Sequence, residues 1–296
     1  MCKISIVILT FNSENFIKSC LVSIFAQGNC GFEVIVVDNG SKDETVNFIK
    51  KDFPQVILIE NKENFGACKA RNQGITAASE DWVLTLDCDI ILETGFLYNI
   101  KNFIKNLSPK IGIIQPKILK SDRITIYSTG IFLSSLRRFY DIGEGKIDNW
   151  KFSKSNYVFG ACSAAAVYKK QMLEEIKEDT GYFDERFFFL VEDVDLAWRA
   201  QRMRWKALYH PAAVSYHFGN SSSLNKAYRQ FLCWRNRNLM LKKHRINRLR
   251  SALIYVLYDL PRLVFLFFSN AHVRKDVLKK TKLAWSIKRS LILFAK

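Results

Sequence analysis

The chain has 296 residues, of which 49% are hydrophobic and 14% aromatic, and this content excludes a chain that is disordered throughout. The formal net charge is +17, but residues 223–296 hold 18 of the 45 Lys and Arg residues and only two of the 28 Asp and Glu residues. Residues 1–222 are therefore nearly neutral, which argues against a nucleic-acid-binding protein and indicates a basic appendage that faces an anionic partner.

The first 120 residues alternate between short apolar stretches and longer mixed ones. Strands are predicted at 4–10, 33–39, 56–61, 82–87 and 111–116, and helices at 14–27, 43–52, 66–78 and 94–107. Strands that are apolar at nearly every position are typical of a parallel sheet covered on both faces. The pattern predicts an α/β fold with a Rossmann-like, mostly parallel sheet and helices on both faces, whose ligands bind at the carboxyl ends of the strands.

The next hundred residues are less regular. Residues 121–160 predict one or two antiparallel strands and a long loop around 137–156, because glycines interrupt every apolar run. Helical spacing returns at 187–202, and residues 207–219 form another extended segment. We expect one domain that covers residues 1–222.

The last quarter of the chain predicts amphipathic helices. Residues 223–245 are basic and aromatic, and residues 273–294 repeat that character. Residues 251–268 are strongly apolar but carry Asp259, Pro261 and Arg262 near their centre. Because a spanning helix needs about 20 consecutive apolar residues and a buried charge is costly there, we expect a bent hairpin or an interfacial helix in the membrane plane.

Two carboxylates interrupt the apolar stretch VLTLDCDIIL at 83–92, namely Asp87 and Asp89. Like charges in a buried strand are costly unless a cation lies between them or water reaches them. Carboxylate oxygens are the ligands that Mg²⁺ and Mn²⁺ prefer. The pattern predicts a divalent cation held by Asp89, with Asp87 on the metal, on one of its waters or on a ribose hydroxyl; the alternative is a solvated turn.

Other polar residues follow the same edge of the predicted sheet. Asp38 ends the second strand and is suited to accept hydrogen bonds from a nucleobase or a ribose. Ser41 and Asp43 are interpreted as a turn and a helix cap. Gly66 opens a helix that carries Arg71 toward the same edge, where a phosphate-facing or structural role competes with a surface salt bridge.

A third acidic group, Glu192-Asp193-Val194-Asp195, lies at the predicted start of a helix after the aromatic run FFFLV. The helix dipole favours ionised carboxylates at this position. The group predicts a general base, with a plain N-cap as the alternative. His210 and His217 stand in an aromatic stretch, where a lone histidine is commonly a packed structural residue; His210 is interpreted as one.

These motifs resemble the family 2 glycosyltransferases of the GT-A fold, and in particular their rhamnosyltransferase-like branch. The resemblance runs through most of residues 3–220 and is specific in the order and spacing of its motifs. The matching segments are Thr10-Phe11-Asn12, Asp38-Asn39-Gly40-Ser41, Asn64-x-Gly66 with Arg71-Asn72, Asp87-Cys88-Asp89, Gly160-Ala161, Gly181 to Phe188, and Glu192 to Leu196.

The resemblance implies an inverting transfer of rhamnose or another hexose from a dTDP- or UDP-sugar to an acceptor hydroxyl. It implies a nucleotide-sugar-binding half at about 1–120 and an acceptor-binding half at about 121–222. Asp193 would be the base, with Glu192 or Asp195 orienting it or holding a sugar hydroxyl. Asp87 and Asp89 would hold Mg²⁺ or Mn²⁺ and the diphosphate, with His217 near the metal. The residues implied on the nucleotide side are Thr10, Asn12, Asp38, Asn39, Gly66 and Arg71.

The basic tail suits an anionic membrane surface that carries a lipid-linked glycan acceptor. The first residues read as a strand and not as a secretory signal, and the seven cysteines are scattered, which is typical of a reducing compartment. We therefore expect a peripheral or monotopic enzyme on the cytoplasmic face of the cell membrane. The alternatives are a tail that serves as a homodimerisation module, a polyprenyl-phosphate sugar synthase, and a non-catalytic sugar-binding or interaction protein.

Overall fold

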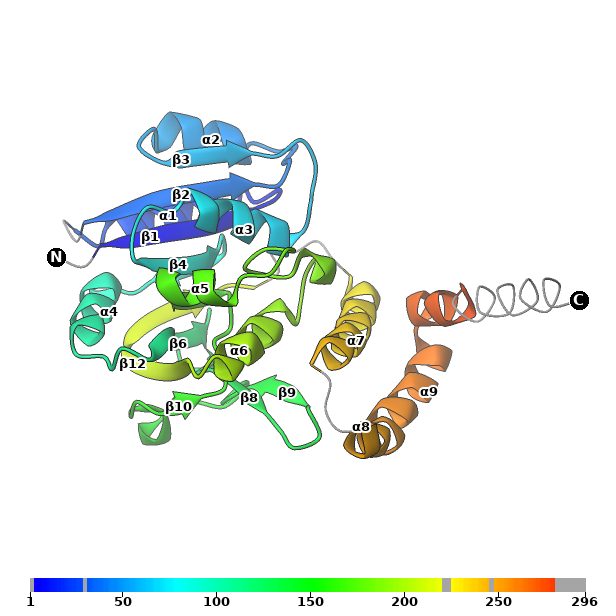
Figure 1. Ribbon diagram of the computed structural model, residues 1–296. Helices are drawn as coiled ribbons and strands as arrows, with labels where there is room; N and C mark the ends of the chain where they lie inside the picture. Colours follow the sequence, from blue (N-terminus) through cyan, green and yellow to red (C-terminus); the bar gives the residue numbers. More distant parts are fainter. Residues whose placement is uncertain (1–2, 29–30, 220–224, 245–247, 280–296) are drawn as a thin grey trace, which may run out of the picture. The chain divides into compact units, whose positions relative to one another are not determined.

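The computed structural model describes residues 3–28, 31–219, 225–244 and 248–279 (Figure 1). The chain divides into two compact units, Met1–Ser223 and Leu224–Lys296.

The first half of the sheet is parallel, as the sequence predicts. Its strands lie in the order β3-β2-β1-β4, and all neighbours run in the same direction. They are β1 (Ile4–Thr10), β2 (Phe32–Asp38), β3 (Ile57–Glu60) and β4 (Trp82–Asp87). Their Ile and Val side chains are nearly all buried, because helices cover both faces. In register, Leu9 of β1 lies between Val37 and Asp87, so the carboxyl ends of the three central strands meet at one edge.

The second half of the sheet is mixed. From β4 the order continues β11-β6-β12-β10. Figure 1 shows β4 in the middle of the sheet and β6, β12 and β10 toward its lower edge. Strand β11 (Ala165–Lys169) runs antiparallel to both neighbours, whereas β6 (Ile111–Lys120) and β12 (Lys206–His217) are parallel to each other. Strand β5 (Ile90–Leu92) pairs with β12, and β7 (Ile126–Ser128) pairs with β6.

Residues 126–158 hold four short strands where one or two are expected. Besides β7 these are β8 (Ile131–Leu133), β9 (Phe139–Asp141) and β10 (Tyr157–Val158). Strands β8 and β9 form a separate hairpin, and a 3₁₀ turn (η1, Trp150–Phe152) lies between β9 and β10. The predicted loop at 137–156 is therefore partly structured.

Helices cover both faces of the sheet, which confirms the predicted fold class. Helices α1 (Ile17–Phe25), α2 (Thr45–Asp52) and α4 (Phe96–Lys105) share one core with the even-numbered residues of β1, β2 and β4. Figure 1 shows α3 (Ala67–Ala77), α5 (Lys170–Ile176) and α6 (Glu192–Arg202) on the other face. Gly74 of α3 packs so closely on Val7 that any side chain there would clash with the strand.

The second unit is helical in the part that the structure describes. It contains α7 (Lys226–Lys243), α8 (Arg248–Ile254), a π-helical turn η3 (Tyr255–Asp259), α9 (Leu260–Ser269) and further helix at 271–279. Of the two alternatives predicted for 251–268, the hairpin is wrong, because α8, η3 and α9 follow one another as one helical segment; the interfacial helix stays a prediction. Pro261 stands in the first turn of α9, where a missing N–H is tolerated. The end of the helix expected at 273–294 lies outside the described residues.

Among the described residues, the helix Ser251–Ser269 has the length and the apolar composition that are needed to cross a membrane.

Candidate functional site

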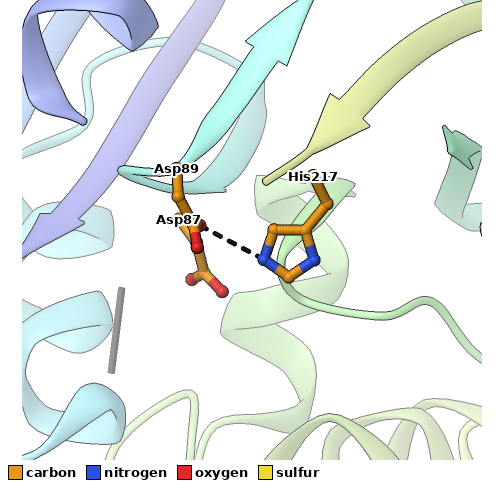
Figure 2. Close-up of side chains that lie close together, drawn as sticks. All are labelled: Asp87, Asp89 and His217. Carbon is orange, nitrogen blue, oxygen red and sulfur yellow. Dashed lines mark ion pairs between the residues drawn. The ribbon is translucent and has the colours of Figure 1, made fainter. Parts of the chain in front are cut away.

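Asp87, Asp89 and His217 come together at the carboxyl ends of two strands (Figure 2). Asp87 ends β4, and Asp89 follows in the turn before β5. His217 ends β12, and the pairing of β12 with β5 places His217 opposite Ile90, next to the aspartates. The Nε2 atom of His217 lies 3.2 Å from Oδ1 of Asp89. One donor atom from each of the three side chains lies within 4.8 Å of the other two.

This donor set fits a divalent cation. Two neighbouring ligands at about 2.1 Å from an octahedral ion are about 3.0 Å apart, close to the observed separation of Asp89 and His217. Carboxylates suit Mg²⁺ and Mn²⁺, and an imidazole suits transition metals. His217 also packs edge-on against Tyr127, with ring centroids 4.2 Å apart, so its ring orientation is fixed.

Arg71 links the metal-side carboxylates to the acidic motif of α6. Its side chain is 2% exposed, and it donates to Oδ1 of Asp87 at 2.8 Å and to Oε1 of Glu192 at 2.6 Å. Burial raises the pKa of Asp87, and the charge of Arg71 partly offsets this shift. Burial acts to lower the pKa of Arg71, but the charges of Asp87 and Glu192 outweigh it, so the pKa lies above the usual value for arginine. The alternative of a surface salt bridge is therefore wrong, because the Arg71 side chain is buried in both of its ion pairs.

The three carboxylates of the acidic motif have different surroundings. Glu192 is buried against Arg71. Asp193 alone of the three is partly exposed, and it accepts a hydrogen bond from the backbone N–H of Val194 at 2.8 Å. Loss of solvation, followed by the charge of Glu192, raises the pKa of Asp193 to about 8. A carboxylate with this pKa takes up a proton readily near neutral pH.

Asp195 is fully buried and pairs with Arg199 at 2.9 Å. Arg199 in turn donates to the carbonyl oxygens of Ile176 at 2.6 Å and Tyr182 at 2.5 Å. These contacts anchor α6 to the segment before it. They indicate a structural role for Asp195, and the orienting or sugar-binding role implied by the resemblance stays a prediction.

Asp38 organises the turn that follows β2. Its Oδ2 atom accepts hydrogen bonds from the N–H groups of Gly40 at 3.0 Å and Ser41 at 2.9 Å, and the Ser41 hydroxyl donates to Oδ1 at 2.5 Å. A carboxylate has about four acceptor positions, so the turn leaves one for a ligand. Thr10 lies beside Asp38 in the sheet register and is also buried.

Asn12, Asn39 and Gly66 join the loops at this edge to one another. The Oδ1 atom of Asn12 accepts from the N–H of Lys42 at 2.8 Å, and the side-chain amide of Asn39 donates to the carbonyl of Gly66 at 3.2 Å. Gly66 has a φ of +86°, and a Cβ atom there would lie 2.5 Å from the ring of Phe188. The contacts that the structure gives these three residues are thus scaffold contacts.

The structure adds Asp141 and Tyr168 to the surroundings of Asp193. Asp141 ends β9; burial raises its pKa to about 6, while a hydrogen bond with Ser128 and the nearby His217 act in the opposite direction. Its charge also helps to raise the pKa of Asp193. Tyr168 of β11 is 1% exposed, and burial, followed by the charge of Asp193, raises the pKa of its hydroxyl. Asp141 carries no motif, so sequence reasoning had no signal for it; the alternation in AAAVY could have placed Tyr168 on the α3 face.

Comparison with known proteins identifies the family. Residues 5–177 match the family model described as glycosyl transferase family 2. The chain is 28% identical over 216 residues to poly-beta-1,6-N-acetyl-D-glucosamine synthase of Staphylococcus aureus, which covers 71% of this chain and 48% of that protein. It is 27% identical over 202 residues to glycosyltransferase GlyA of Streptococcus pneumoniae, which covers 65% of this chain and 29% of that protein. The chain thus spans about half the length, or less, of the curated relatives it matches.

Solved structures show the same fold. The 1–349 fragment of S. aureus TarS superimposes with a TM-score of 0.53 at 19% identity, covering 85% of this chain and 69% of the fragment. Mannosyltransferase PcManGT from Pyrobaculum calidifontis, in complex with GDP-Man and Mn²⁺, gives a TM-score of 0.59 at 16% identity, covering 95% of this chain and 80% of that chain. Because the family model covers more than half of the sequence and the sheet matches these structures, the protein belongs to glycosyl transferase family 2 and has the GT-A fold.

Proposed function

We propose that the enzyme transfers rhamnose or another hexose, with inversion, from a dTDP- or UDP-sugar to a hydroxyl group of a lipid-linked glycan acceptor, at the cytoplasmic face of the membrane. The product would enter a cell-surface polysaccharide or related glycan. One observation carries the proposal: Asp87, Asp89 and His217 converge within 4.8 Å at the edge where the nucleotide-side residues also lie. The structures of TarS with UDP-GlcNAc and of PcManGT with GDP-Man and Mn²⁺ support a nucleotide-sugar donor and a divalent cation.

The donor side of the proposed site combines a cation site with a nucleoside site. Asp89, Asp87 and His217 would hold Mg²⁺ or Mn²⁺, which when bound neutralises the charge of a departing diphosphate. Arg71 keeps the Asp87 carboxylate in place through its 2.8 Å ion pair. Asp38, with one acceptor position left, and Thr10 would contact the nucleoside at the ends of β2 and β1.

The acceptor side depends on Asp193. An inverting transfer needs one base that takes the proton of the attacking hydroxyl on the face opposite the leaving group. Asp193 is the partly exposed carboxylate of its motif, and Glu192 keeps its proton affinity high. We assign Asp193 as that base, Glu192 and Arg71 as positioning residues, and Asp195 as an anchor of α6.

A donor screen tests this proposal. Full-length protein would be incubated with dTDP- and UDP-sugars and a lipid-linked acceptor, with Mn²⁺, Mg²⁺ or a chelator, and the release of nucleoside diphosphate would be followed. We expect release that depends on both the cation and the acceptor, and a loss of at least about 100-fold in Asp89→Asn. Asp52→Asn, which alters an exposed carboxylate paired with Lys18, is the matched control and should behave as the wild type.

Two outcomes decide between the alternatives. Transfer to a polyprenyl monophosphate that bears no sugar would replace the proposed acceptor by the lipid phosphate itself. Binding of a nucleotide-sugar without any transfer, under all cation conditions, would contradict the base assigned here and favour a non-catalytic binding protein.

A further inference from the structure

The helical unit exposes large apolar side chains along the segment from α8 through η3 to α9. The exposed fractions reach 64% for Leu257, 67% for Phe265 and 74% for Phe268, and those of Leu253, Val256 and Val264 are 51–57%. Scattered exposed leucines are ordinary in soluble proteins, but such a concentration on one segment marks an interaction surface. We call these six residues the apolar side of the segment.

Two polar side chains in or directly after this segment bind α7 instead. Asp259 is 8% exposed and accepts from Nε of Arg237 in α7 at 2.6 Å. Asn270, directly after α9, donates to the carbonyl oxygen of Ala227 at 2.8 Å. Arg262 donates to the hydroxyl of Tyr258 at 2.7 Å. The central charges that interrupt this stretch in the sequence are therefore paired within the unit, and the apolar side carries neither of them.

These contacts argue against a segment that crosses a bilayer. Two contacts tie the segment to α7: Asp259 pairs with Arg237, 22 residues earlier, and Asn270 bonds to Ala227, 43 residues earlier. If the segment crossed the hydrocarbon region, α7 would be drawn in with it, and α7 exposes Lys226 and Lys242. Charged side chains at that depth are expensive, whereas both helices can lie in the plane of the headgroups without that cost.

The charge of the unit favours an anionic lipid surface over a second copy of the chain as the partner of the apolar side. Residues 223–296 contain 18 Lys and Arg residues and two acidic residues, one of which is the paired Asp259. Two copies of so basic a surface repel each other, while an anionic lipid surface attracts both. Arg274, Lys275 and Lys279, which follow α9, are exposed and continue the basic character of the unit.

We propose that the apolar side of α8–η3–α9 inserts into the headgroup region of an anionic bilayer, with the segment parallel to the membrane plane and the Arg237–Asp259 pair on the side turned away from the lipid. The inference rests on the proposed function only for its purpose, which is to bring the enzyme to a lipid-linked acceptor. The binding itself needs neither donor nor metal.

The test is co-sedimentation of full-length protein with vesicles of phosphatidylcholine alone or mixed with phosphatidylglycerol. We expect binding to the anionic vesicles that weakens as salt is raised from 0.1 M to 0.5 M, within the range where screening becomes strong. Replacing Phe265 and Phe268 together by Ser should weaken binding at least about 10-fold. Tyr98→Ser, in α4 and 63% exposed, is the control of equal exposure and should leave binding unchanged.

Orientation is tested by an environment-sensitive fluorophore attached through Val256→Cys or Phe268→Cys, with quenchers placed at known lipid depths. An in-plane segment predicts shallow quenching at both positions, and deep quenching at either position would overturn it. Equal binding to neutral vesicles, or full binding by the double Phe variant with unchanged circular dichroism, would also overturn the proposal. A dimer in lipid-free solution that the double variant abolishes would make a second copy the occupant. Because these assays contain no donor, a failed donor screen with intact vesicle binding would contradict only the proposed function.

Discussion

Asp193 differs from the neighbouring carboxylates because its surroundings favour the protonated form while leaving the side chain partly exposed. Glu192 and Asp195 are buried instead and each pairs with an arginine. A base that must accept a proton from a hydroxyl group is more effective when its pKa lies near the working pH. This contrast within four residues supports the assignment of Asp193 as the base.

Replacement of Asp193 by Asn should therefore separate binding from turnover. We expect turnover to fall by about 10² to 10⁴-fold, as is typical when a general base is lost, while the affinity for the donor changes little. Single-turnover kinetics and calorimetric titration of the donor measure the two effects, and Asp52→Asn serves as the control. Normal turnover in the Asp193→Asn variant would contradict the assignment of Asp193 as the base.

The pH profile gives a second prediction at this scale. The charge of Glu192 is the second largest cause of the raised pKa of Asp193, so Glu192→Gln should lower that pKa. Since the base acts when ionised, kcat/KM rises as the pH rises through its pKa, and this acidic limb should move to lower pH in the variant. The limb is measured between pH 5 and 9 at saturating cation concentration. A limb that stays in place or moves to higher pH would contradict the electrostatic coupling.

At the scale of elements, two buried ion pairs fix the first turn of α6. Glu192 ties it to α3 through Arg71, and Asp195 ties Arg199 to the carbonyl oxygens of Ile176 and Tyr182. Both pairs are less than 10% exposed on every side chain. The helix that carries the proposed base Asp193 is thus fixed at its start to α3 and to the segment that precedes α6.

Asp195→Ala should destabilise the fold more than it affects the chemistry. Removing one partner of a buried pair leaves Arg199 uncompensated and costs about 3–5 kcal/mol in the free energy of unfolding. Asp52→Ala breaks the pair with Lys18, whose side chains are 61% and 30% exposed, and should cost less than about 1 kcal/mol. Urea denaturation of the two variants measures the difference; equal costs would show that the Asp195 pair is not an anchor.

The elements that sequence reasoning placed well are those with a local signal. The five strands predicted in the first 120 residues are all present, because continuous Ile and Val runs mark buried strands wherever they pair. The antiparallel insertion of β11 between β4 and β6 has no local signal, since it depends on pairing between residues 53 to 87 positions apart. The hairpin alternative for 251–268 was wrong for a similar reason. A charged Asp259 indicates an interruption of the helix unless its partner Arg237, 22 residues earlier, is known.

The candidate site shows the same division. Asp87 and Asp89 were recognisable as polar residues at a strand end, whereas a place for His217 near them was implied only by the family resemblance; topology brings the three together. The pairing of Arg71 with Glu192 joins residues 121 positions apart and was not visible. Asp141 stands in an irregular stretch, and the structural role of Asp195 follows from Arg199 only once the carbonyl groups around that arginine are in place.

At the scale of the whole molecule, chemistry and charge are carried by different parts of the chain. The unit Met1–Ser223 is nearly neutral and holds every residue of the candidate site, while the unit Leu224–Lys296 holds nearly all of the excess positive charge. This division predicts that salt affects attachment to lipid far more than it affects transfer to a soluble acceptor analogue. Transfer to such an analogue, measured between 0.1 M and 0.5 M salt, should stay within about twofold; a parallel loss of both would show that the basic unit acts in the chemistry itself.

The central claim is that Asp87, Asp89 and His217 bind a divalent cation that is required for tight binding of the donor. Calorimetric titration of the preferred nucleotide-sugar into full-length protein, with Mn²⁺ and then with a chelator, tests it most directly. We predict that the cation tightens donor binding at least about 10-fold in the wild type, and that this gain disappears in Asp89→Ala. Donor affinity that is the same with and without the cation, or a gain that survives in Asp89→Ala, would contradict the account.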